Sequence, residues 1–177
     1  MSWTGVKRWV ATHPEPSIAV AGLFFLTMPW VLWVGVANSG SAIGSFVDAN
    51  PWLLAGPPAA FLFGVSGTSF CIVCLRARAG LPHVAGMCIG AAFRCALMVT
   101  AISAGLTLVG WFVGLQETPQ DLLQVALLTI VAGAQSGLYV AVVSGIGATV
   151  GRSYARRQIT RGKWEVTTPV EPPKEQP

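Results

Sequence analysis

The sequence predicts an all-α, polytopic membrane protein with four transmembrane helices arranged as two antiparallel hairpins. Four long stretches of the 177-residue chain contain no charged side chain: 16–47, 49–75, 95–116 and 122–151. A hydrocarbon core of about 30 Å needs roughly 20 apolar residues in a helix, so each stretch is long enough to cross a bilayer. In addition, hydrophobic residues make up 53% of the chain and charged residues 10%, which excludes an ordinary soluble domain.

The basic residues supply the third observation, because all 11 of them lie outside the uncharged stretches. Bases precede the first stretch, separate the second from the third, and follow the fourth. The two other connections hold Asp48, and Glu117 with Asp121, and contain no base. This alternation satisfies the positive-inside rule at every loop. We therefore expect a multi-pass protein of the cytoplasmic (inner) membrane with both termini in the cytoplasm.

The first 37 residues predict an interfacial anchor followed by a transmembrane helix. Residues 1–16 combine Trp3 and Trp9 with two adjacent bases, a mixture typical of an interfacial segment. The first transmembrane helix is expected over 17–37, and Pro29 inside it is expected to kink it.

The second helix is expected over 52–75, after a short, turn-forming loop that makes the first two helices a hairpin. Pro57 and Pro58 fall in its first turns, where a missing N–H costs least. The segment that follows holds Arg76 and Arg78 and then a weakly apolar run, LPHVAGMCIGAAF. That run predicts either an interfacial helix or an inward extension of the third helix.

The second hairpin consists of helices over 95–115 and 122–150, joined by the tight, acidic turn QETPQD. The transmembrane domain therefore spans 17–151. The tail, 152–177, is basic and then rich in Pro and Glu, and we expect its last ten residues or so to be disordered because they cannot bury apolar area.

Small residues recur every four positions on two of the predicted helices. The absence of side-chain bulk lets another helix approach closely, either within the chain or in a second copy of it. The predicted packing positions are Gly56, Ala60 and Gly64 on the second helix, and Gly133, Gly137, Ala141 and Gly145 on the fourth. Two such stripes among four helices favour some contact between subunits.

Polar residues within the predicted spans are sparse, and no acid or base lies near a helix midpoint. This argues against a self-contained proton-coupled transporter, which needs an ionisable group in the membrane. Thr107, Thr129 and Gln135 are the candidates for an ion path. Gln135 is the costliest of them to leave unpaired in lipid, so it should face another helix or a wet lumen.

Other chemistry is not indicated. Cys71, Cys74, Cys88 and Cys95 cluster near the cytoplasmic side, but only the first pair has the short spacing of a metal site, so we expect neither metal nor cofactor. No nucleophile elbow, P-loop or dinucleotide motif is present, and we do not expect an enzyme. The bases lie at membrane boundaries rather than on a separate face, so nucleic-acid binding is not expected.

Both hairpins resemble flagellar stator A-type subunits of the MotA/TolQ/ExbB proton-channel family. The first, SGSAIGSFVDANPWLLAGPPAAFLFGV, matches that family's Phe–hydrophobic–Asp turn leading into an apolar helix, with Phe46, Asp48 and Gly56 at the matching positions. The second, GLTLVGWFVGLQETPQDLLQVALLTIVAGAQSGL, matches a pattern that includes Thr107 and Thr129. The large cytoplasmic domain of stator subunits is replaced here by a short segment, so torque transmission is not expected.

The resemblance implies a homo-oligomeric subunit whose third and fourth helices line an ion path, with Thr107 and Thr129 as lumen hydroxyls. It also implies a single-span partner that carries the ion-binding carboxylate. Two other interpretations of the sequence remain open. One is a structural or accessory subunit of a larger membrane complex. The other is a membrane-permeabilising protein of the phage holin type, which is also short, multi-span and basic at its C-terminus.

Overall fold

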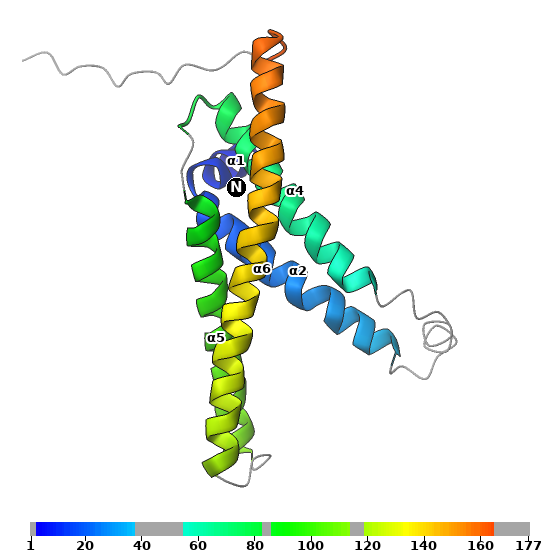
Figure 1. Ribbon diagram of the computed structural model, residues 1–177, viewed down its shortest axis with the longest axis vertical. Coiled ribbons are helices and arrows are strands. Elements are labelled where there is room, and N and C mark those ends of the chain that lie inside the picture. The colour runs from blue at the N-terminus through cyan, green and yellow to red at the C-terminus, as the bar shows by residue number, and fades with distance from the viewer. Residues whose placement is uncertain (1–2, 38–54, 83–85, 114–118, 165–177) are drawn as a thin grey trace, which may run out of the picture.

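The computed structural model describes residues 3–37, 55–82, 86–113 and 119–164, and the chain there is almost entirely α-helical (Figure 1). The described residues contain no strand, which confirms the all-α prediction. The helices are α1 (Trp3–Thr12), α2 (Pro14–Ala37), α4 (Gly56–Arg78), α5 (Met87–Phe112) and α6 (Pro119–Thr160).

Three of these helices are long and apolar enough to cross a membrane. They are α4, the Met87–Gly110 part of α5, and the Leu123–Thr160 part of α6. A membrane protein is therefore supported. The first predicted span coincides with α2, a helix of 24 residues that continues through Pro29; its role as a fourth span stays a prediction. The loop before α4 and the extreme C-terminal tail lie outside the described residues.

Two helices are longer than predicted at the end of the bundle that carries Arg76, Arg94 and Arg152, which we call the basic end. The third helix, expected to begin at 95, begins at Met87, so the weakly apolar run extends that helix through Arg94. The fourth, expected to end at 150, continues to Thr160. The physical reason is that a charge ends an apolar stretch without ending a helix, since Arg, Gln and Ala are all good helix formers.

Glycine ends two of these helices. Gly80, after α4, and Gly162, after α6, both have a φ of 64°, a backbone conformation that favours glycine. At Gly162 the N–H donates to the carbonyl of Ile159 at 2.9 Å, and the next N–H, of Lys163, donates to Gln158 at 3.0 Å. The corresponding pair of bonds follows α4, and both ends are therefore Schellman caps.

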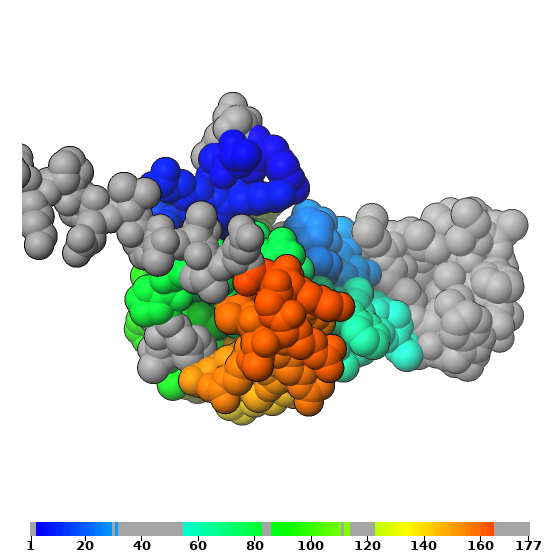
Figure 2. Space-filling model, turned by 90° about the horizontal axis from the view of Figure 1, so that it is seen from above, coloured from blue at the N-terminus to red at the C-terminus, as the bar shows by residue number. Residues whose placement is uncertain are grey.

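The four long helices form two pairs that converge at one end and diverge at the other. In Figure 1, α5 and α6 run side by side along the long axis, whereas α2 and α4 run together away from them. The pairs meet toward the end where α1 and the C-terminal part of α6 lie. Seen along α6 from that end, α1 lies to one side of the longer helices (Figure 2).

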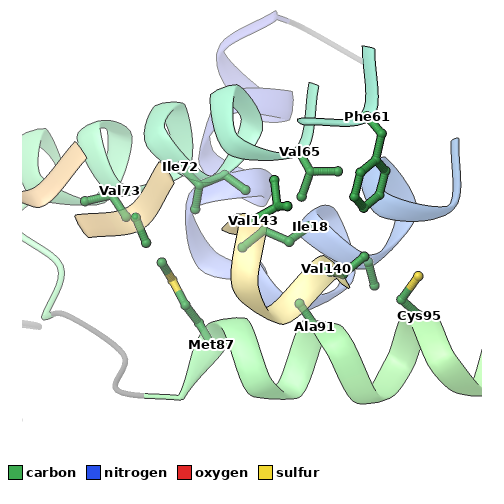
Figure 3. Packing of buried hydrophobic residues seen from close by; sticks show 12 residues of the cluster. Ile18, Phe61, Val65, Ile72, Val73, Met87, Ala91, Cys95, Val140 and Val143 are labelled. Carbon is green, nitrogen blue, oxygen red and sulfur yellow. The ribbon is translucent and has the colours of Figure 1, made fainter. Parts of the chain in front are cut away.

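The apolar core occupies this convergence. Ile18 of α2, Ile72 of α4 and Met87 of α5 are almost fully buried there. Val140 of α6 lies among them, with its side chain directed toward the other helices (Figure 3). Away from the core, most described apolar side chains of α5 and α6 are exposed in the single chain, as expected for helices whose outer faces meet lipid or other subunits.

Candidate functional site

The close contact between α5 and α6 depends on glycines, which have no side chain. A Cβ atom at Gly133 would collide with the hydroxyl of Thr100, and one at Gly137 would lie 2.9 Å from both the Ala92 carbonyl oxygen and the Ala96 Cβ. Both glycines belong to the predicted stripe. Their lack of bulk brings the two helix backbones into direct van der Waals contact.

The close contacts on α6 leave the predicted stripe after Gly137. The sequence pattern places Ala141 and Gly145 next, but Ala141 is only half-buried and a Cβ at Gly145 would meet nothing within 4 Å. A strict spacing of four turns by about 40° per step on a helix of 3.6 residues per turn. The stripe therefore rotates off the contact face.

The helix contact continues instead through Gly147 and Gly151, which the sequence analysis missed. A Cβ at Gly147 would overlap the backbone of Ser66 in α4, and one at Gly151 would lie 3.0 Å from the carbonyl oxygen of Phe70. The missed signal is a spacing that alternates between four and three residues, which is typical of helices that supercoil around each other.

The predicted stripe on α4 also contains both a position in close contact with another helix and a position with open space around it. The ring of Phe25 in α2 occupies the space above Gly64, and Ala60 is half-buried. Gly56, in contrast, has nothing within 4 Å of an added Cβ. Within one chain, Gly64 is therefore a packing position and Gly56 is not.

Two of the three ion-path candidates have their hydroxyl hydrogens bonded within their own helix. The Thr129 hydroxyl donates to the Val125 carbonyl at 2.8 Å, and the Thr107 hydroxyl donates to the Ser103 carbonyl at 2.9 Å. Thr129 is also 8% exposed, so it lies inside the molecule rather than on an open face. Such back-bonded threonines keep only their oxygen lone pairs for an ion or water.

Gln135, the third candidate, lies on another face of α6. Six positions beyond Thr129, its side chain is rotated by roughly 120° around the helix, and it is exposed. Its side-chain nitrogen donates to the Tyr139 hydroxyl at 2.9 Å. The structure therefore does not bring Gln135 together with Thr129.

Tyr139, the hydrogen-bond partner of Gln135, also lines a cavity between α6 and the helices α2 and α4. It lines an open, mainly apolar cavity of about 350 Å³ whose other walls include Leu26 of α2, Phe61 of α4 and Val143 of α6. Tyr139 was missed by the sequence analysis, although its spacing of four from Gln135 is the signal that would have paired them.

None of the protein-family models, curated proteins or solved structures compared with this chain matches it. The resemblance to the MotA/TolQ/ExbB family thus stays a prediction from sequence.

The four cysteines are free thiols with different surroundings. Cys71 is exposed, Cys74 and Cys88 are half-buried, and Cys95 is buried in the core. Among the described residues, no group of three or more His, Cys, Asp and Glu could hold a metal ion. Cys95 packs in the core like other small apolar residues.

The basic end of the bundle contains two arginine contacts that the sequence did not predict. Arg94 of α5 pairs with Glu15 of α2 at 3.2 Å, and Gly90 leaves the space that the Glu15 carboxylate occupies. Glu15 precedes the first uncharged stretch and therefore lies on the predicted side of the membrane that carries the bases, which is the signal for such a pair. Arg76, only 8% exposed, donates to the carbonyls of Ala11 at 2.5 Å and Pro82 at 2.7 Å.

Proposed function

We propose that this protein is a homo-oligomeric membrane channel subunit whose α5 and α6 line an ion path, completed by a single-span partner that carries a carboxylate. In this proposal α2 is the fourth span, and both termini are in the cytoplasm of a cell whose inner membrane holds the protein. The proposal includes no enzymatic activity.

The observation that carries the proposal is the exposed amide of Gln135. It lies near the middle of the uncharged stretch 122–151 and points away from the core of its own chain. An amide can donate two and accept two hydrogen bonds, and Tyr139 accepts one of the two donated. Facing lipid with the rest unpaired would cost several kcal/mol, on the order of 2–7. A neighbouring subunit or a water-filled lumen removes that cost.

The need for a partner chain follows from the absence of charged residues in these parts of α5 and α6. The uncharged stretches of α5 and α6, 95–116 and 122–151, contain no Asp, Glu, His, Lys or Arg that could bind and release a proton within the membrane near neutral pH. A path along these helices would require an ionisable group from another chain. A carboxylate on a single-span helix fits that requirement, and the cavity lined by Tyr139 offers an apolar surface beside α6.

Ion flux through the reconstituted protein and partner tests this function. Gln135→Leu should reduce the flux about tenfold or more, because a path in the membrane has few substitute hydrogen-bond groups. Thr129→Val is the matched control on the same helix: its hydroxyl hydrogen is already bonded to Val125, so the flux should stay close to that of the wild type. Unchanged flux in Gln135→Leu would exclude the path.

Topology is tested separately by thiol labelling from outside the cell, in a variant whose native cysteines are replaced by alanine. Engineered cysteines at Ser41 and Gln116 should be labelled, whereas those at Arg78 and Gly162 should be protected, because all bases are assigned to the inside. External labelling at Gly162 would reverse the proposed orientation.

A structural subunit of a larger membrane complex is the second candidate. The internal bonds of Thr107 and Thr129 favour it, because these hydroxyls then need no water or ion. Mass measurement of the intact particle in mild detergent distinguishes the two functions. A ring of identical chains with a single-span protein supports the channel, whereas one copy among several different proteins supports the structural role.

A further inference from the structure

A cavity at the basic end of the bundle combines an apolar wall with arginine side chains. It has a volume of about 260 Å³ and lies between the last turns of α4 and the extension of α6. Arg76, Arg152 and Arg156 line it, together with apolar residues that include Val73 and Ile159. No acidic side chain is among the described residues that form its walls.

Arg76 lines this cavity, and its guanidinium is held by only part of its hydrogen-bonding capacity. Its two terminal nitrogens donate to the carbonyls of Ala11 and Pro82, which hold the guanidinium in place. Its Nε atom is buried and has no hydrogen-bond partner among the described residues. A buried charge without a counter-charge is costly, and the described residues that line the cavity supply no acid, so an anion bound beside the Arg76 guanidinium would stabilise this site.

The position of the cavity relative to the membrane indicates which anion would bind there. The uncharged stretch of α4 ends at Leu75 and that of α6 ends at Gly151, and both helices run toward the basic end. Contacts between Phe70 and Gly151 show that the two helices are level there. The cavity therefore lies where the hydrocarbon region gives way to lipid head groups.

We propose that this cavity is a binding site for an anionic phospholipid. Arg152 and Arg156 contact the phosphodiester from the exposed side, Arg76 faces it from the buried side, and the apolar wall takes the first part of an acyl chain. Arg152 and Arg156 also line a second, polar cavity of about 500 Å³, which gives the head group access to water. The proposal is independent of ion conduction, because it requires only that the chain is embedded in a membrane.

The test uses the full chain in nanodiscs, with spin-labelled phosphatidylglycerol and phosphatidylcholine as probes. Wild-type protein should bind phosphatidylglycerol in preference to phosphatidylcholine. The double variant Arg152→Gln, Arg156→Gln should lose about tenfold of that preference or more, because it removes two positive charges that attract the net negative charge of phosphatidylglycerol, which the choline group cancels in phosphatidylcholine. These two side chains are exposed, so the variant keeps the buried contacts of Arg76.

The matched control removes the same charge from the same end of the chain. Arg161→Gln with Lys163→Gln alters two exposed bases that line neither cavity, and the preference should survive. Equal loss in both double variants would show general attraction to basic residues and overturn the site. No loss in the Arg152, Arg156 variant would overturn it as well.

A second measurement separates a lipid from a free ion. In neutral detergent, phosphatidylglycerol should raise the thermal unfolding temperature of the wild type, and inorganic phosphate at the same concentration should not, because phosphate lacks the acyl chain that the apolar wall receives. Ala77→Leu, which fills part of that wall without changing any charge, should weaken the lipid effect. Equal stabilisation by inorganic phosphate would overturn the lipid assignment.

Discussion

Gly147→Leu is expected to separate α4 from α6 and to destabilise the fold by at least about 3 kcal/mol. At this position any side chain would meet the backbone of Ser66, which cannot rotate away as a flexible side chain can. The helices must move apart, and the van der Waals contact along their interface is then lost. Thermal unfolding in detergent, followed by circular dichroism, measures the effect.

Gly145→Leu is the control for this prediction, two residues away on the same helix. A Cβ there meets nothing within 4 Å, so the single chain should fold with unchanged stability. If Gly145 instead lies where two subunits meet, the leucine should lower the subunit count measured by mass without altering the unfolding of the chain. Equal destabilisation by the two substitutions would contradict the helix contact described here.

Arg76→Met is expected to release α1 from the bundle. The arginine joins the carbonyl of Ala11 at the end of α1 to that of Pro82 after α4, and hydrogen bonds from a charged donor contribute about 1.5–3 kcal/mol each. Methionine fills a similar space without donating. Hydrogen exchange of the α1 amides should accelerate about tenfold or more while exchange in α5 stays slow.

Arg78→Met serves as the comparison on the same helix. Arg78 is exposed and stacks on the ring of Trp164, with 4.2 Å between its guanidinium carbon and the ring centroid. Its loss should leave exchange in α1 unchanged. Slow exchange in α1 of Arg76→Met would show that apolar contacts alone, such as those of Ala11, hold that helix.

Charge and hydropathy predicted the helical class well, because a membrane-crossing segment must satisfy its backbone within a helix. They predicted helix ends poorly. The bases from Arg152 onward end the apolar stretch, whereas the helix itself ends near Gly162, where the backbone turns to positive φ. Hydropathy predicts where an apolar stretch ends, whereas a glycine with positive φ marks where the helix ends.

The contact face of α6 shows what a repeat of small residues can and cannot predict. Gly133 and Gly137 lie in close contact with α5, whereas an added Cβ at Gly145 would meet nothing within 4 Å. The close contact with α4 is made by Gly147 instead. The choice depends on how the helices cross, which is a property of all four together. Similarly, the orphan donor of Arg76 depends on carbonyls of Ala11 and Pro82, which no local pattern links to it.

The unbroken course of α6 has a mechanical consequence. From Gly151 to Thr160 the helix continues beyond its uncharged stretch for about 14 Å, at 1.5 Å per residue, without a break. A rotation or tilt of the part beside Gly133 would therefore be transmitted along a continuous helix to the basic end. Any event in the membrane that turns α6 would displace its arginines on the surface, and a force applied to those arginines would turn the helix inside.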